Sequence, residues 1–311
     1  MNIVILSQPY PMGNGCGLNA AIGEYFQQQG HEVYMLEQLN GQMAGVDQYA
    51  EMINSVKPDL LYYEMLDDAS FKAIEKVNCK KILVFASNGI LKEYEDILDH
   101  PEWYDGIYTN SLKMKSLFEN KGIPTQHFQY YHCWLKNSDL HFEDKYLEDC
   151  VFLGMGFNRL SSDAYKMERE LFFLNQFSFD FAIYGNGWPR EIPWYKGLLP
   201  QEDMGKLYAS ARSAIAIIAP GQRKQGMINN RFVEIGYSEC PIITYPYPEV
   251  DWFGAEKYLN FVTSKNEIED VVAKCYNKTD EIIKKTQQMK IFIDKQTDLY
   301  YSGLEDLIDK I

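Results

Sequence analysis

The chain has 311 residues, of which 46% are hydrophobic and 24% are charged. These proportions exclude wholesale disorder, and the length is sufficient for two α/β domains of about 150 residues, each with its own core. The formal net charge of −14 argues against a protein that coats nucleic acid by general electrostatic attraction. No segment reaches the roughly 20 apolar residues of a membrane span and the start lacks the basic flank of a signal peptide, so we expect a cytoplasmic protein.

Apolar runs in the first half of the chain alternate with helical patterns. They predict strands at residues 3–6, 33–36, 60–63, 82–85 and 106–108. Such alternation favours a parallel sheet covered by helices on both faces. The first half therefore predicts a Rossmann-like domain.

A polar, acidic segment at residues 136–145 separates this half from a second series of the same kind. The second series predicts strands at residues 151–154, 179–184, 214–218, 242–244 and 259–262, and the last thirty residues have the apolar spacing of a helix. We predict an N-terminal domain of residues 1–148, a second domain of residues 149–285 and a C-terminal helix of residues 286–311.

Glycine-rich loops after predicted strands are candidate binding sites, because glycine lets a ligand approach backbone N–H groups closely. The first such loop, Gly13-Asn14-Gly15, lacks the spacing of the dinucleotide fingerprint of dehydrogenases. A loop that faces an acceptor or a sugar and a tight turn with a purely structural purpose are equally compatible with these residues.

Two further glycine-rich loops follow strands of the second half. Gly154 and Gly156 lead to Arg159, so a phosphate bound there would meet backbone donors and a cation together. Gly185 and Asn186 belong to the next loop. Each loop alone is a weak signal, but α/β sheets bind ligands where the carboxyl ends of parallel strands converge.

Arg231 and Glu234 lie about one turn apart on a predicted helix and face the same way. An arginine can fork onto a diphosphate, and a carboxylate can accept the hydroxyls of a ribose, so the pair suits a nucleotide-sugar. The alternative is an ion pair between neighbours on an exposed helix.

The order of these motifs resembles the donor domain of GT-B glycosyltransferases. The motifs are YGNGW at residues 184–188, YKGLLPQEDMGKLYASARSAIAII at residues 195–218 and NNRFVEIGYSECPIIT at residues 229–244. The sequence is most similar to the CgeB-like group and to the phage β-glucosyltransferases that modify hydroxymethylcytosine in DNA. The resemblance covers less than half of the chain, since the first half agrees only in its pattern of strands and helices.

This resemblance implies two Rossmann-like domains with parallel sheets facing a central cleft, and a C-terminal helix that returns to the first domain. The first domain would bind the acceptor and the second the nucleotide-sugar. The resemblance further implies that Arg231 binds the diphosphate, that Glu234 binds the ribose and that Leu199 lies beside the nucleobase. The other donor-binding residues that it implies are Gly154, Gly156, Arg159, Gly185 and Asn186.

The sequence does not identify which residue would act as the catalytic base. The phage inverting enzymes place an Asp just after a strand of the first domain, whereas residues 84–88 of this chain contain no carboxylate. Glu64 and Asp67 are the nearest candidates, with acids that stabilise a helix N-terminus as the alternative. A retaining mechanism that uses the donor phosphate would need no such base. We predict no metal ligands; Mg²⁺ or Mn²⁺ on the diphosphate stays open, although there is no D-x-D motif to hold it.

We therefore expect a hexosyl- or pentosyltransferase that moves a sugar from an NDP-sugar, with a UDP-sugar favoured, to an acceptor hydroxyl. The acceptor is a hydroxylated pyrimidine in phage DNA, which would place the protein in the host cytoplasm, or a cell-surface, spore or small-molecule glycan. The missing base also leaves open a catalytically inactive nucleotide-binding module.

Overall fold

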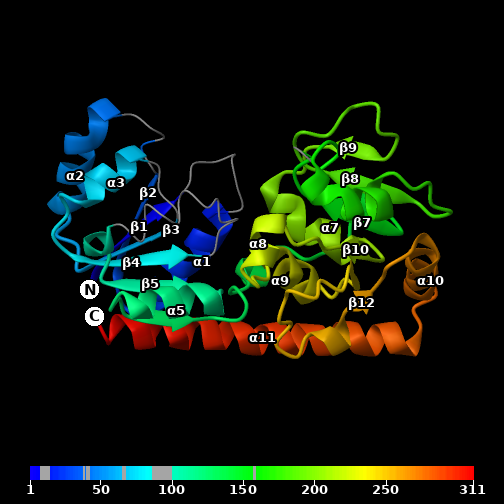
Figure 1. Ribbon diagram of the computed structural model, residues 1–311. Coiled ribbons are helices and arrows are strands. Elements are labelled where there is room, and N and C mark those ends of the chain that lie inside the picture. The colour runs from blue at the N-terminus through cyan, green and yellow to red at the C-terminus, as the bar shows by residue number, and fades with distance from the viewer. Residues whose placement is uncertain (8–14, 38, 40–42, 65–67, 86–99, 157–158) are drawn as a thin grey trace. The chain divides into compact units, whose positions relative to one another are not determined.

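The computed structural model describes residues 1–7, 15–37, 39, 43–64, 68–85, 100–156 and 159–311. The chain divides into two units (Figure 1). Unit 1 comprises residues 1–129 and 299–311, and unit 2 comprises residues 130–298. The division falls between residues 129 and 130, whereas the sequence predicted a boundary between residues 148 and 149.

Unit 1 is built on a six-stranded parallel sheet with the strand order β2-β1-β3-β4-β5-β6. Its strands are β1 (Asn2–Ser7), β2 (Glu32–Glu37), β3 (Leu60–Glu64), β4 (Lys80–Phe85), β5 (Gly106–Thr109) and β6 (Thr125–His127). Its helices include α1 (Gly15–Gln28), α2 (Val46–Ser55), α3 (Asp68–Ile74) and α5 (Leu112–Asn120). The apolar runs form the central strands because both of their faces are buried, as the sequence predicted.

The last helix, α11 (Asp280–Ile308), contributes residues to both units. Its final turns belong to unit 1, where the hydroxyl of Tyr300 lies 3.0 Å from that of Tyr62. Tyr108 donates a hydrogen bond to the backbone oxygen of Tyr300. A Cβ atom on Gly303 would lie 2.9 Å from the Tyr108 hydroxyl, so the helix approaches the strands closely at this point.

Unit 2 repeats the same architecture with the strand order β12-β11-β10-β7-β8-β9, again with parallel pairing throughout. Its strands are β7 (Cys150–Leu153), β8 (Phe181–Tyr184), β9 (Tyr195–Gly197), β10 (Ala214–Ile215), β11 (Ile242–Thr244) and β12 (Asn260–Phe261). Its helices include α6 (Lys166–Glu168), which continues into a π-helical turn (Arg169–Phe173), α7 (Met204–Ser210), α8 (Pro220–Lys224), α9 (Asn230–Tyr237) and α10 (Lys265–Tyr276). The two parallel sheets confirm the predicted α/β class.

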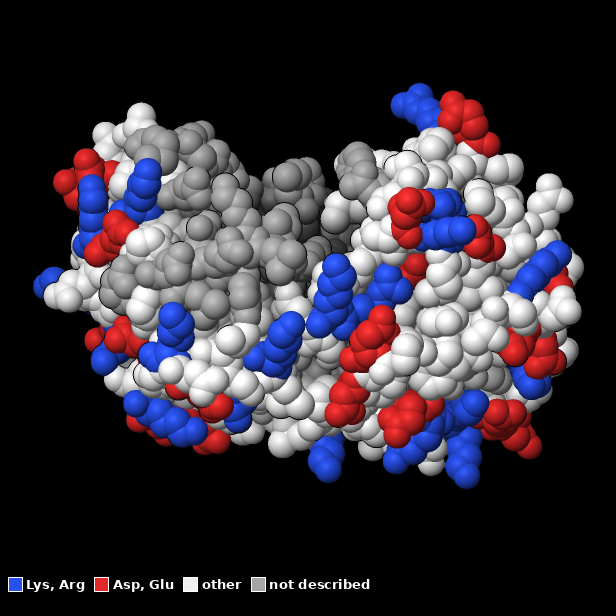
Figure 2. Space-filling view, viewed as in Figure 1, with Lys and Arg blue, Asp and Glu red and all other residues white. Residues whose placement is uncertain are grey.

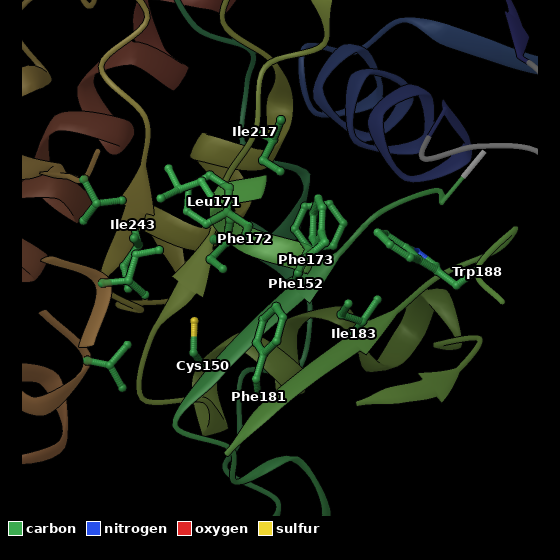
Figure 3. Close-up of a cluster of buried hydrophobic side chains, with 14 residues drawn as sticks. Cys150, Phe152, Leu171, Phe172, Phe173, Phe181, Ile183, Trp188, Ile217 and Ile243 are labelled. Carbon is green, nitrogen blue, oxygen red and sulfur yellow. The ribbon is translucent and has the colours of Figure 1, made fainter. Parts of the chain in front are cut away.

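The core of unit 2 joins its central strands to the π-helical turn (Figure 3). Phe152 of β7 packs edge-to-face against Phe173 and Trp188, with ring centroids 4.9 and 5.8 Å away. Trp188 belongs to the glycine-rich loop after β8, so this aromatic cluster ties the loop to the sheet.

The acidic segment between residues 136 and 149 is part of unit 2. Lys206 of α7 lies 3.1 Å from a carboxylate oxygen of Glu143 and 3.1 Å from one of Asp203. The hydroxyl of Tyr146 donates to Asp203 at 2.6 Å. The segment that the sequence suggested as a domain boundary is therefore held on α7 by charges and hydrogen bonds.

Within the described ranges, no helix combines the length and apolarity that crossing a membrane requires.

Candidate functional site

The predicted donor-binding residues all lie in unit 2. They occupy the segments that follow the carboxyl ends of β7, β8 and β9, together with helix α9. The carboxyl ends of parallel strands lie along one edge of a sheet, which is where open α/β sheets bind ligands.

Backbone hydrogen bonds connect the three loops. The N–H of Gly156 donates to the backbone oxygen of Asn186 at 2.7 Å, and the N–H of Gly185 donates to that of Gly197 at 2.9 Å. The indole N–H of Trp188 donates to the backbone oxygen of Gly154 at 2.7 Å. The loops after β7 and β8 and the end of β9 thus form one connected structure.

The glycines in these loops are needed where one backbone packs on another. Gly185 has a φ of +129°, and a Cβ atom there would lie 2.2 Å from the backbone oxygen of Gly154. A Cβ atom on Gly156 would lie 2.7 Å from the backbone oxygen of Gly187. Contact between loops is therefore a structural reason for these glycines, beside the access that they give to a ligand.

Arg159 lies at the end of the loop after β7. Its Nε donates to the backbone oxygen of Met155 at 2.6 Å, and its guanidinium lies over the rings of Phe152 and Tyr165 at 5.4 and 4.9 Å. Its Nη1 is buried and has no hydrogen-bond partner within the described parts of the chain. Burial lowers the pKa of Arg159, and the nearby positive charge of Arg231 lowers it further. The two predicted phosphate-binding arginines are therefore close enough for their charges to interact.

Arg231 and Glu234 lie on α9, one turn apart as predicted, and form an ion pair with an Nη1–Oε2 distance of 2.6 Å. The side chain of Arg231 is 13% exposed and that of Glu234 is 0% exposed. The pair is therefore buried, unlike the exposed helix pair that was the alternative interpretation.

Two further donors hold the carboxylate of Glu234. The indole N–H of Trp134 donates to Oε1 at 2.8 Å, and the amide of Asn230 donates to the same oxygen at 3.0 Å. Nη1 of Arg231 also donates to the hydroxyl of Tyr208 at 3.1 Å. Within the described residues, Nη2 and Nε of Arg231 have no hydrogen-bond partner.

The surroundings keep Arg231 charged. Burial acts to lower the pKa of Arg231, but attraction to Glu234 and the contacts with Tyr208 outweigh this effect and raise the pKa above its ordinary value. Asn229, the N-cap residue of α9, makes no side-chain cap hydrogen bond. The N–H groups of the first turn lack intrahelical acceptors, so the positive end of the helix lies beside a charged guanidinium.

Some of the other predicted residues lie in described parts of the chain, and others do not. Leu199 is half-buried just after β9, and its neighbour Leu198 is 70% exposed. Glu64 ends β3, but its side chain is not among those described, and Gly15 begins α1. Three predicted residues lie outside the described parts of the chain: Gly13, Asn14 and Asp67. Among the described side chains, no group of His, Cys, Asp and Glu is arranged to hold a metal ion.

Unit 2 also contains a hollow of about 580 Å³. It is lined by Lys166, Glu168, Arg223 and Ser264, among others, and none of the predicted donor-binding residues lines it. Arg223 forms an ion pair with the buried Glu168 at 2.8 Å, so the one arginine of this hollow already has a carboxylate partner. We therefore place the candidate site at Arg159 and Arg231 rather than at this hollow.

Sequence reasoning did not identify Trp134, Asn230 or Tyr208 as site residues. Trp134 follows a run of buried residues that starts at Tyr130, outside the α/β pattern of the second half. The aromatic run just before the polar segment is the signal that could have indicated packing within unit 2.

Comparisons with known proteins agree with this geometry. Residues 168–309 match the family model described as glycosyl transferase-like, a region that includes α9 and its Arg231–Glu234 pair. The match covers less than half of the chain, and most of it lies in unit 2. No curated protein matches the sequence.

Solved structures are similar along the whole chain. An α-glucosyltransferase in complex with UDP has a TM-score of 0.67 at 9% identity, over 99% of each chain. The DNA-modifying enzyme β-glucosyltransferase has a TM-score of 0.62 at 12% identity, over 99% of this chain and 100% of the other. The protein HepE from Anabaena, in complex with UDP-glucose, has a TM-score of 0.59 at 11% identity, over 100% and 99%.

The fold is GT-B. At these identities the likeness shows the fold, which confirms the predicted pair of Rossmann-like units. The predicted similarity to the CgeB-like group stays a prediction.

Proposed function

We propose that the protein is a glycosyltransferase that moves a sugar from a UDP-sugar to an acceptor hydroxyl, with its donor site in unit 2. The observation that carries this proposal is the pair of guanidinium groups at the loop edge of the second sheet. Within the described residues, Nη1 of Arg159 is buried and has no hydrogen-bond partner, and Nε and Nη2 of Arg231 have none either. The glycosyl transferase-like match and the UDP-bound GT-B structures support the same assignment.

The proposed chemistry follows from charge. When the sugar leaves, negative charge develops on the departing diphosphate, and fixed cations near that position stabilise the transition state. Arg159 and Arg231 would supply these cations, and the uncapped first turn of α9 would add backbone donors. We propose that Leu199 contacts the nucleobase. The loop residues that would contact the sugar and the phosphates are Gly154, Gly156, Gly185 and Asn186.

Transfer to a hydroxyl also requires removal of the acceptor's proton. We propose Glu64 or Asp67 as the base of an inverting reaction, because Glu64 ends the central strand β3 of unit 1 and Asp67 comes three residues later in the sequence. Gly13, Asn14 and Gly15 would belong to the acceptor or sugar loop. The stereochemistry of the product decides between this proposal and a retaining reaction that needs no base.

The acceptor has two candidate classes. A hydroxylated pyrimidine in DNA, with the protein encoded by a phage, is suggested by the fold shared with a DNA-modifying β-glucosyltransferase. A neutral acceptor, such as the hydroxyl of a glycan or of a small molecule, is suggested by the charge of unit 1.

That charge is strongly negative. Residues 1–129 and 299–311 contain 20 Asp and Glu against 10 Lys, and all the arginines of the chain lie in unit 2. On the face in Figure 2, acidic and basic side chains of the described residues are interspersed rather than gathered into a basic stripe. Tight DNA binding depends on cations that neutralise several phosphates, so the composition of unit 1 favours the neutral acceptor.

The test is an assay of UDP release from a panel of UDP-, GDP- and ADP-hexoses and a UDP-pentose, with and without acceptors. We expect slow hydrolysis of one UDP-sugar alone and faster release with the correct acceptor. The acceptor panel contains hydroxymethylcytosine duplex DNA and neutral glycans, each tested across a salt series. A rate of transfer to DNA that falls steeply with salt concentration would establish the DNA acceptor. A rate of transfer to a neutral hydroxyl that does not change with salt would establish the neutral acceptor.

Two negative outcomes have different meanings. Binding of UDP without release from any UDP-sugar would identify an inactive nucleotide-binding module. Failure to bind any nucleotide would contradict the proposed function.

A further inference from the structure

The hollow of about 580 Å³ in unit 2 has a size typical of small-molecule sites, which measure about 300 to 1,000 Å³. Its walls come from three parts of the chain, which follow strands β7, β10 and β12. These parts are residues 163–175, Arg223 of α8 and residues 263–265 at the start of α10. None of the predicted donor-binding residues lines the hollow, so an occupant would be held by other side chains.

The charges that line this hollow balance one another. The basic residues are Lys166, Arg223 and Lys265, and the acidic residues are Asp163, Glu168 and Glu170. A lining without net charge attracts neither a multiply charged anion nor a bare cation. Among the side chains that the structure describes, no group of His, Cys, Asp and Glu is arranged to hold a metal ion. The lining therefore favours a neutral, polar occupant.

Glu168 brings an unused hydrogen-bond acceptor to this lining. Its side chain is 1% exposed, and its Oε1 lies 2.8 Å from Nη1 of Arg223. The hydroxyl of Tyr247 donates to the same oxygen at 3.3 Å. Oε2 is buried and has no hydrogen-bond partner in the described parts of the chain. A buried carboxylate oxygen without a donor costs free energy, so Oε2 favours an occupant that can donate a hydrogen bond.

The rest of the lining mixes polar and apolar groups. Nδ2 of Asn175 donates to the backbone oxygens of Glu170 and Leu171 at 2.7 and 2.9 Å, so the side-chain oxygen of Asn175 is a further acceptor. Lys166 is exposed and has donors only, and Met167 and Leu171 add apolar surface. A saccharide suits such a lining, because each hydroxyl both donates and accepts and the C–H groups of the ring are apolar.

We propose that this hollow binds a neutral saccharide, one hydroxyl of which donates to Oε2 of Glu168. Because that oxygen is buried, the bond forms when an exposed side chain of the wall, such as that of Lys166, turns aside. The site goes beyond the proposed function, since it uses none of the residues assigned to the UDP-sugar.

The test is a titration followed by saturation-transfer NMR, which detects ligands that bind with millimolar dissociation constants. The probes are glucose, galactose, N-acetylglucosamine and cellobiose, with inorganic phosphate as the anionic probe. Ala164→Trp adds a large ring to the wall of the hollow at an exposed position. Ala273→Trp is the matched control, because Ala273 is an exposed residue of α10 that does not line the hollow.

A second pair of variants tests the role of the buried carboxylate. Glu168→Gln keeps the shape of the side chain but replaces one oxygen with an amide and removes the charge. Asp149→Asn makes the same change in another carboxylate that pairs with an arginine of unit 2, Arg212, and Asp149 does not line the hollow. The comparison therefore separates a loss at the hollow from a general effect of breaking an ion pair.

We expect at least one of the saccharides to bind to the wild type and to both control variants with the same affinity. Ala164→Trp should abolish this binding, and Glu168→Gln should weaken it roughly tenfold, because a hydrogen bond to a charged group is replaced by a weaker one. Inorganic phosphate should not bind in the hollow. If Glu168→Gln does not fold, Ala164→Trp decides the question, since its position is exposed.

Four results would overturn the inference: no binding of any of these saccharides, equal binding by Ala164→Trp and Ala273→Trp, unchanged affinity in a folded Glu168→Gln protein, or binding of phosphate that Ala164→Trp abolishes. The last result would identify an anion site instead. Failure of the wild-type protein to bind UDP would contradict the proposed function but not this inference, so the two can fail separately.

Discussion

Adding one methyl group to Gly185 tests whether packing between loops builds the donor site. Gly185 has a φ of +129°, and a Cβ atom there would lie 2.2 Å from the backbone oxygen of Gly154. Gly197 is a matched control, because its φ is +103° and a Cβ atom there would meet nothing within 4 Å. Gly185→Ala and Gly197→Ala therefore share the backbone strain, but only the first creates a clash.

The magnitude of each effect follows from the contacts. Backbone strain at a positive φ costs about 1 to 3 kcal/mol in either variant. In Gly185→Ala the backbone at Gly154 must also move. This breaks the hydrogen bond from Trp188 to the Gly154 oxygen and the one from Gly156 to Asn186, each 2.7 Å long. At about 1 kcal/mol for each bond, Gly185→Ala should cost about 2 kcal/mol more than Gly197→Ala.

Urea unfolding followed by tryptophan fluorescence measures this difference. Four of the five tryptophans, at positions 134, 188, 194 and 252, belong to unit 2, so the signal reports mainly on that unit. UDP affinity should also fall in Gly185→Ala, because the displaced loop carries Arg159. Equal losses of stability in the two variants, or unchanged UDP binding in Gly185→Ala, would refute the packing argument.

Two other predictions concern ionisable groups in unit 2. A hydrogen bond from Tyr146, reinforced by nearby lysines, lowers the pKa of Asp203 from 3.8 to about 2. The stability from Asp203 is therefore present above about pH 3.8 and lost as the pH falls through about 2, so the gap between the urea midpoints of wild type and Asp203→Asn should close over that range. A gap that does not change with pH would contradict this reasoning. Burial raises the pKa of the Cys150 thiol to about 12 and that of Cys240 above its ordinary value, so both should resist a thiol reagent at neutral pH until the protein unfolds. Mass spectrometry of labelled peptides checks this, and rapid labelling of either thiol in the native state would contradict it.

The central strands could be predicted because both of their faces are buried, which leaves continuous apolar runs in the sequence. Two of the four edge strands carry no such signal. β6 (Thr125–His127) and β9 (Tyr195–Gly197) lie at the ends of their sheets, contain polar residues and were not predicted. The predicted ends of strands also differ from the structure. A strand was predicted over residues 214–218, but β10 (Ala214–Ile215) ends at Ile215.

The candidate site could be predicted only in part. Helical spacing was sufficient to place Arg231 and Glu234 on one face of α9, and the glycines marked the loops. The burial of the pair and its contact with Trp134 depend on a segment 100 positions earlier, which no local pattern connects to α9. Contacts of this kind arise from tertiary packing, so they become visible only in the folded structure.

The central claim is that Arg231 binds the diphosphate of a UDP-sugar, and calorimetric titration of UDP tests it most directly. Arg231→Lys keeps a cation for Glu234 but loses the planar fork. Arg212→Lys is the matched control, because Arg212 pairs with Asp149 before β7, at the opposite edge of the same sheet. We expect the wild type and Arg212→Lys to bind UDP alike and Arg231→Lys to bind it roughly tenfold more weakly. Equal affinity in all three proteins, or no binding of UDP to the wild type, would contradict the claim.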